Sequence, residues 1–205
     1  MHPKVLSRQA WKTVQSLSKD GWLEDWTLAG GTGLALRLGH RYSEDLDLFR
    51  DGPFEPMGLA ESLANVGRVR VQQAAAGTLH LELDGLRMSF LRTETSFLFD
   101  GTRYRGLTVA DPRDIAVMKV IAIGGRGSRK DFVDLFFYLR NLGTLDQVLS
   151  LVHERFETAD FNTYHLLKSL VYFEDAEQEP MPNMILPISW DSVKELLVAE
   201  VRRLS

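Results

Sequence analysis

Apolar and polar positions along the first part of the chain follow two periods, one typical of helices and the other of strands. Apolar side chains recur at helical spacing in residues 3–19, which predict a helix that ends near Asp20-Gly21. The segments that follow predict a strand, a short helix, a second strand and a second helix, at residues 25–31, 33–39, 44–50 and 56–66. The predicted order is therefore αβαβα.

Strict alternation on both sides of Asp84-Gly85 predicts that the sheet continues through a hairpin. An Asp-Gly pair between two alternating segments is typical of a two-residue type I′ turn. Counting outward from the turn gives the cross-strand pairs of one face, which are Glu82 with Arg87 and His80 with Ser89. We expect Arg87 to neutralise Glu82, because opposite charges on facing strand positions attract.

The second half of the chain has the pattern of successive helices. Asp111 as N-cap, Pro112 at the first helical position and Asp114 at the capping-box position predict the start of the first one. Its apolar run carries one embedded lysine, Lys119, and ends at two glycines. A second helix is predicted from a Ser128 cap to Gly143.

Helical spacing continues from residue 145 to residue 205. A proline-rich segment at residues 179–190 interrupts it, and a last helix is predicted near 191–203. Neither internal repeats nor low-complexity segments occur. The pattern of the whole chain therefore combines an N-terminal sheet with a helical C-terminal part.

Composition narrows the chemistry that the chain can perform. The chain has 205 residues, 44% of them hydrophobic and 25% charged, and so can bury a core. It lacks both a long apolar run and a signal peptide, so we expect no membrane segment and a cytoplasmic protein. Because it contains no Cys, carboxylates are the expected ligands of any metal, and a hard ion such as Mg²⁺ suits them. A net charge of −4 argues against a strongly basic nucleic-acid-binding domain.

Two aspartates in the second predicted strand have the spacing of a metal site. Asp45 and Asp47 stand two residues apart, so their side chains project from the same face of the strand. Both can reach one ion or bridge two, as phosphoryl and nucleotidyl transfer require. Taken alone, the pair more often marks the solvated face of a sheet. The metal site of a sugar-nucleotide glycosyltransferase is a further reading, but the short chain and the nearby glycines favour it less.

A glycine cluster precedes these aspartates. Gly30, Gly31, Thr32 and Gly33 lie between a predicted strand and a predicted helix. Backbone N–H groups at such a turn can approach phosphate oxygens under the positive end of the helix dipole. Glycine also serves an ordinary tight turn. The order of strand, glycines, helix and acidic strand favours a phosphate site facing a metal site.

Two segments of the chain resemble one known family. GGTGLALRLGHRYSEDLDLF (30–49) is similar to the first motif of the nucleotidyltransferase-fold proteins of the AbiEii/AbiGii toxin family, and MKVIAIGGRGSRKDFVDLFFYL (118–139) to their second. The resemblance covers residues 25–140. It implies an α+β fold, with a polymerase-beta-like nucleotidyltransferase core of mixed sheet and flanking helices at residues 1–110 and a helical region packed on it at 111–205.

The resemblance also implies an activity and partners. It implies a Mg²⁺-dependent enzyme that moves a nucleotide from an NTP to an RNA, tRNA included, or to a protein acceptor. Such a protein is the toxin of a type IV toxin–antitoxin or phage-defence system, with an antitoxin protein as its partner. The implied catalytic residues are Asp45, Asp47, Lys119 and Asp131, and the implied nucleotide-binding residues are Gly30, Gly31, Thr32, Arg126, Lys130 and Asp134, with Mg²⁺ on Asp45 and Asp47.

The second motif also permits plainer interpretations. Lys119 lies in an apolar helix, so it either has a buried counter-charge or ligand, or extends its amine to the surface. Arg126, between glycines, either contacts phosphate or simply occupies a loop. Asp131 suits a helix cap, whereas Asp134 lies one turn later and can anchor Lys119 or Arg126.

One departure from the implied pattern bears on activity. Nucleotidyltransferases of this broad class place a third acidic residue on a following strand, where it helps to deprotonate the attacking hydroxyl. Ser89 takes that position here. The alternative function is therefore a catalytically weak or inactive nucleotide- or RNA-binding protein of the same fold. The scattered histidines, His80 among them, lack ligand spacing and are expected to be structural, with no zinc site.

Overall fold

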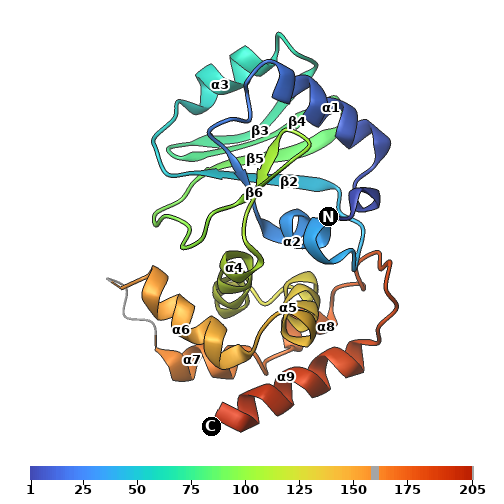
Figure 1. Ribbon diagram of the computed structural model, residues 1–205, viewed down its shortest axis with the longest axis vertical. Coiled ribbons are helices and arrows are strands. Elements are labelled where there is room, and N and C mark those ends of the chain that lie inside the picture. Colours follow the sequence, from blue (N-terminus) through green and yellow to red (C-terminus); the bar gives the residue numbers. More distant parts are fainter. Residues whose placement is uncertain (158–161, 205) are drawn as a thin grey trace.

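The computed structural model describes residues 1–157 and 162–204, and its centre is one mixed sheet (Figure 1). The strands follow the order β3-β4-β5-β2-β1-β7-β6. β2 is antiparallel to β1 and parallel to β5, and the other pairs in the β3-β4-β5 half are antiparallel. The strand bounds are Thr27–Leu28 (β1), Asp45–Arg50 (β2), Val69–Ala75 (β3), Thr78–Leu83 (β4), Leu86–Arg92 (β5), Thr102–Tyr104 (β6) and Leu107–Val109 (β7).

Helices cover both faces of the sheet and form the C-terminal part. α1 and α3 lie above the sheet in Figure 1, and α2 leads from the other face to the helices below. The helix bounds are Pro3–Val5 (η1), Arg8–Lys19 (α1), Gly30–Leu38 (α2), Pro56–Leu63 (α3), Pro112–Gly125 (α4), Arg129–Asn141 (α5), Leu145–Arg155 (α6), Thr163–Ser169 (α7), Glu174–Glu177 (α8) and Trp190–Leu204 (α9). The predicted α+β fold with a helical C-terminal part is confirmed.

Two hydrophobic cores flank the sheet. The first lies between the sheet and α1 and α3, and contains Leu46 and Leu48 of β2 and Phe90 of β5. The second lies among the helices of the C-terminal part, and Ala29 and Leu34 connect it to the start of α2. Because β2 and β5 bury one face under α1 and α3, their alternate side chains are left on the opposite face. The division of the chain into domains at residue 110 stays a prediction.

The predicted hairpin is confirmed in turn and register. Asp84 and Gly85 both adopt positive φ, 50° and 84°, as a type I′ turn requires. Glu82 pairs with Arg87 and His80 with Ser89, as the outward count from the turn predicted. Glycine and aspartate tolerate this backbone conformation better than other residues, so the local sequence determines the turn.

Three features differ from the predictions. β6 and β7 were not predicted, because their three-residue lengths give too little alternation to recognise. α2 begins at Gly30 rather than at Gly33, so the glycines form its first turn. Asp114 accepts hydrogen bonds from the N–H groups of Leu98 and Phe99 instead of completing a capping box.

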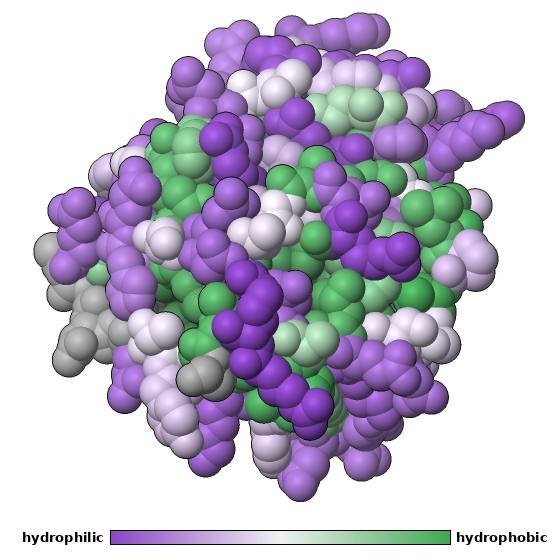
Figure 2. Space-filling view, turned by 60° about the horizontal axis from the view of Figure 1, so that its bottom comes forward, coloured by the Kyte–Doolittle hydropathy of each residue, from purple (hydrophilic) through white to green (hydrophobic). Residues whose placement is uncertain are grey.

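The helical region presents a mixed surface. Figure 2, which brings the lower end of the molecule forward, shows hydrophobic groups between hydrophilic ones. Of the predicted helical span 145–205, residues 158–161 and 205 lie outside the described residues. Within the described part of the chain, no helix is long and apolar enough to cross a membrane.

Candidate active site

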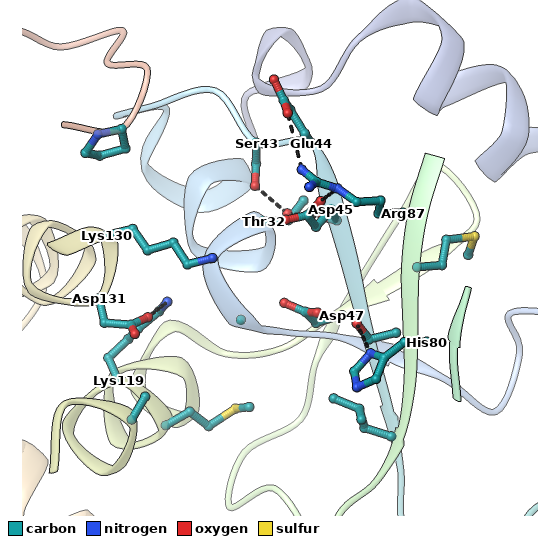
Figure 3. A pocket seen from close by; sticks show the side chains of 18 of the residues that line it. Thr32, Ser43, Glu44, Asp45, Asp47, His80, Arg87, Lys119, Lys130 and Asp131 are labelled. Carbon is teal, nitrogen blue, oxygen red and sulfur yellow. Dashed lines mark hydrogen bonds and ion pairs between the residues drawn. The ribbon is translucent and has the colours of Figure 1, made fainter. Parts of the chain in front are cut away.

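A cleft of about 590 Å³ separates the free face of the sheet from the helical region (Figure 3). Its sheet side is formed by β2, β5 and β4, and its helical side by α4 and α5. The cleft brings together nine of the ten residues that the sequence singled out, which are Gly30, Gly31, Thr32, Asp45, Asp47, Lys119, Arg126, Lys130 and Asp131. Asp134 lies behind the wall, fully buried.

Asp45 and Asp47 point into this cleft from β2. Asp45 already has a cationic partner, because its Oδ1 lies 2.6 Å from Nε of Arg87 on the neighbouring strand. Asp47 pairs in register with Ser89 and has neither an ion pair nor a side-chain hydrogen bond among the described residues. The expectation that Arg87 neutralises Glu82 is wrong. Arg87 faces Glu82 across β4 and β5, but its ion pairs are with Asp45 and Glu44 on the other side.

The first turn of α2 packs directly on the acidic strand. Gly30 has a φ of +57°, and a Cβ placed on it would lie 2.7 Å from Oδ2 of Asp47. The first N–H groups of a helix lack intrahelical acceptors, so those of this turn are donors for an anion. The Thr32 hydroxyl bonds to the Ser43 hydroxyl at 2.6 Å and to the carbonyl of Asp45. Thr32 therefore fixes the start of β2 against the start of α2.

Gly30→Ala is expected to damage this junction. The left-handed conformation costs an L-residue about 1–2 kcal/mol, and the added methyl group displaces the Asp47 carboxylate. We expect a fall of that size in the free energy of unfolding, measured by urea denaturation, together with weaker nucleotide binding in a titration. Gly85→Ala is the matched control, because it has a φ of +84° but no atom within 4 Å of its added Cβ. If Gly30→Ala loses no more binding than Gly85→Ala, the junction does not position Asp47.

The helical wall is built on a buried ionic network around Asp134. Its Oδ1 accepts hydrogen bonds from His40 Nε2 at 2.8 Å and from Arg41 Nε at 2.7 Å. Its Oδ2 accepts from Arg41 Nη2 at 3.0 Å and lies 2.7 Å from Lys119 Nζ. The carboxylate is 0% exposed, so all of its lone pairs are directed to protein donors.

This network keeps its members charged. Burial alone would favour the neutral acid, but the Lys119 ammonium and the Arg41 guanidinium outweigh it and hold the pKa of Asp134 well below its usual range. Burial likewise opposes the charge of Lys119, whereas the carboxylates of Asp134 and Asp131 together raise its pKa. The sequence-based alternative of an exposed, extended lysine is excluded, since the Lys119 side chain is only 6% exposed.

The helical wall of the cleft also includes three further residues of the second motif, which are Arg126, Lys130 and Asp131. Lys119 Nζ donates to Asp131 Oδ1 at 2.7 Å, and Asp131 Oδ2 lies 3.4 Å from Arg126 Nε. Lys130 extends toward the cleft in Figure 3 and has no ion pair within the described ranges. Arg126 is 66% exposed and Lys130 is exposed as well, so both cations are accessible to a ligand. The wall therefore faces the two aspartates of β2 with positive charge.

Nothing in the sequence indicated that His40 and Arg41 belong to the site. They bind Asp134, which lies 94 and 93 residues away in the chain, and no local pattern reveals such a contact. A segment near the C-terminus also joins the cleft. Tyr42 N–H donates to the Asn183 carbonyl at 2.8 Å and Ile185 N–H to the His40 carbonyl at 2.9 Å, and Asn183 lines the cleft. The only sequence signal for His40 and Arg41 was their position side by side between two predicted elements.

The acidic side of the cleft fits a divalent cation in part. Among the described residues Asp47 has no ion-pair or hydrogen-bond partner for its side chain, and Asp45 Oδ1 is buried beside Arg87, whose side chain is 55% exposed. No cluster of three or more His, Asp or Glu residues suited to a metal occurs in the residues that the structure describes. The chain thus offers two hard oxygen ligands. Mg²⁺ characteristically takes one or two carboxylates and completes its shell with water and substrate phosphates.

Comparisons with known proteins agree with this geometry. The family model described as "Nucleotidyl transferase AbiEii toxin, Type IV TA system" matches residues 13–105. An uncharacterized protein of Aquifex aeolicus, aq_aa25, is 38% identical over 204 residues, which are 97% of this chain and 96% of that protein.

Two solved structures share the fold. The nucleotidyltransferase toxin MenT4 (Rv2826c) of Mycobacterium tuberculosis H37Rv superposes with a TM-score of 0.61 at 17% identity, over 95% of this chain and 80% of its own. JHP933 from Helicobacter pylori superposes with a TM-score of 0.53 at 15% identity, over 97% of this chain and 93% of its own. The mixed sheet with flanking helices is therefore a nucleotidyltransferase fold.

Proposed function

Since the chain belongs to the AbiEii nucleotidyl transferase toxin family, we propose that it transfers a nucleotide from an NTP to an RNA, such as tRNA, with Mg²⁺ as cofactor. The observation that carries this proposal is the opposition of charges across one cleft. Two carboxylates, Asp47 and the Arg87-paired Asp45, face a wall of three cations, with helix N–H donors between them. A metal-bound triphosphate has the charge distribution that this arrangement complements.

The first turn of α2 would hold phosphate oxygens. The backbone N–H groups of Gly30, Gly31 and Thr32 are the donors, since the Thr32 hydroxyl is already engaged by Ser43 and the Asp45 carbonyl. Glycine is needed at residue 31 because a Cβ there would lie 3.1 Å from Asp134 Oδ2 and collide with Arg41. Because residues 30 and 31 have no side chain, phosphates could approach β2 closely.

The cations of α4 and α5 would bind the rest of the triphosphate. Arg126 and Lys130 are exposed enough to follow the leaving pyrophosphate. Lys119 is held in place by two carboxylates, so its ammonium contributes a fixed positive charge. Asp131 holds Lys119 and Arg126 together, and Asp134 acts from behind the wall by orienting Lys119.

The transfer itself is an in-line displacement. An acceptor hydroxyl attacks the α-phosphorus, the bond to the β-phosphate oxygen breaks, and pyrophosphate leaves. Held by Asp45 and Asp47, Mg²⁺ would neutralise phosphate charge and lower the pKa of the attacking hydroxyl. The protein has little covalent work to perform, and its contribution is to position the reactants and neutralise their charge.

Two observations support an RNA acceptor and a protein partner. The edge strand β3 is exposed along its length and begins between two exposed arginines, Arg68 and Arg70. They extend the positive charge beyond the cleft, where an RNA backbone can bind despite the net charge of −4. Membership of a type IV toxin–antitoxin family also favours an antitoxin protein as partner.

The test is a labelling experiment with the whole protein. Each NTP is supplied with Mg²⁺ and either total RNA or total protein, once with an α-³²P label and once with a γ-³²P label. Nucleotidyl transfer labels RNA only from the α position, and chelation of the metal abolishes the label. Label from the γ position would indicate phosphoryl transfer instead, and an acceptor in the protein pool would replace RNA as the substrate.

One residue favours a second candidate function. Ser89 stands where a third acid is expected, which favours a protein that binds nucleotide or RNA without transfer. The same preparation distinguishes the two. NTP binding in a calorimetric titration, without label in any acceptor pool, supports the binding protein and excludes the enzyme.

A further inference from the structure

The position of the expected third acid lies next to a histidine. Ser89 pairs in register with Asp47 on one side and with His80 on the other, so the three side chains form a row across β2, β5 and β4. All three line the cleft. Asp47 and His80 appear on the sheet side of the cleft in Figure 3. The row therefore places an imidazole two strands away from the proposed metal ligand.

His80 lies on β4, one strand farther from Asp47 than Ser89 does, but its side chain extends back toward β5. His80 Nδ1 lies 3.0 Å from the Ser89 hydroxyl oxygen, so the ring leans over the serine. Ser89 also orients the ring, because a hydrogen bond at Nδ1 determines which nitrogen remains available.

We propose that His80, oriented by Ser89, is the general base that accepts the proton of the acceptor hydroxyl. This inference rests on the proposed nucleotidyl transfer. Nδ1–H donates to Ser89 Oγ, which leaves the lone pair on Nε2. The hydroxyl proton moves to Nε2, its oxygen forms the bond to the α-phosphorus, and pyrophosphate departs with the electron pair of the broken bond. The imidazolium keeps its Nδ1–H bond to Ser89 and later releases the proton to solvent.

Charged groups on the surrounding elements act on this imidazole. On the sheet they are Asp47 of β2, Arg87 of β5, Glu82 of β4 and Arg70 of β3. Across the cleft they are the Lys119–Asp131 pair, Arg126 and Lys130.

The test compares His80→Gln with wild type in the α-labelled assay. We expect kcat to fall by about 10²–10³-fold, the range of a lost general base, with little change in KM for the NTP. The acid limb of the kcat–pH profile should disappear, because glutamine does not titrate. Imidazole added to His80→Ala should restore part of the rate. Ser89→Ala, which only releases the ring, should lose about tenfold, and His165→Gln, an exposed histidine of α7, should lose nothing.

The outcomes separate this assignment from the proposed function. Transfer by wild type that His80→Gln retains, with an unchanged pH profile, overturns the role of His80 alone. A higher KM at constant kcat also overturns it, because the histidine would then only bind substrate. Absence of transfer by wild type overturns the proposed function and the base with it.

Discussion

Asp47→Asn is expected to abolish nucleotidyl transfer, with a loss on the order of 10³-fold or more in kcat/KM, while the fold is kept. Loss of the proposed metal ligand is expected to remove about 4 kcal/mol or more of stabilisation from the transition state, since each 1.4 kcal/mol is about tenfold in rate. Asp47 makes no ion pair in the described parts of the chain, so the amide leaves no cation unpaired. The α-labelled assay measures the loss, and a calorimetric titration with Mn²⁺ measures the metal site directly.

Asp45→Asn should differ in one respect. Its carboxylate holds Arg87 at 2.6 Å, so the substitution releases this arginine into the cleft as well as removing a ligand. We expect an equal loss of transfer but a smaller loss of NTP affinity, since the freed guanidinium can contact phosphate.

Controls for both variants come from elsewhere on the surface. Asp20→Asn, exposed at the end of α1, is the matched control and should keep both activity and metal binding. Retention of Mn²⁺ binding by both cleft variants would remove the metal-site assignment.

Asp134→Ala is expected to lower the free energy of unfolding by about 3–5 kcal/mol, which is a large part of the total for a domain. The substitution removes the carboxylate that pairs with Lys119 and Arg41, and both cations stay buried. Urea denaturation followed by circular dichroism measures the change. Asp134→Asn keeps the shape but loses the charge, and it provides a milder variant if the alanine protein does not fold.

Asp146→Ala is the matched control, because it removes an aspartate from an ion pair with Arg203 that is half exposed. Solvent screens such a pair, so the unfolding midpoint should hardly move. Equal effects of the two substitutions would contradict the central place of Asp134.

The same network predicts a direction for acid stability. The folded pKa of Asp134 is depressed, so its ionisation adds stability that is fully present above the unfolded value of about 3.9. That contribution is lost as the pH falls from there toward the folded pKa. Wild type should therefore lose stability below about pH 4 more steeply than Asp134→Asn. Parallel curves for the two proteins would exclude this carboxylate as a source of acid sensitivity.

Local sequence determined those parts of the fold that depend on neighbouring residues. The hairpin followed from Asp84-Gly85, and the start of α4 followed from Asp111 and Pro112. In both cases a backbone conformation or a cap is set by residues next to each other in the chain. The start of α2 was misplaced for the opposite reason. Gly30 opens α2 with a φ of +57° at a place where an added Cβ would meet Asp47, and this contact between distant residues is not visible in a local glycine pattern, which is more typical of a turn.

The candidate site was predictable in its members but not in its connections. Alternation placed Asp45 and Asp47 on one face, and the second motif supplied Lys119 and Asp131. The partners of Asp134 lie more than ninety residues away, and sequence spacing carries no information on such contacts. Arg87 was assigned to Glu82 because the hairpin was recognised, whereas its pairing with β2 depends on a parallel strand contact between distant segments.

The late position of the segment that carries Asn183 affects when the cleft can form during synthesis of the protein. Strand β2 leaves the ribosome early, but the segment that contacts residues 40–42 follows about 140 residues later. Until then His40 and Tyr42 lack their backbone partners, and the cleft has no wall at that end. A nascent chain that has not yet reached Asn183 therefore lacks these contacts, and the cleft stays open at that end until the segment has been made.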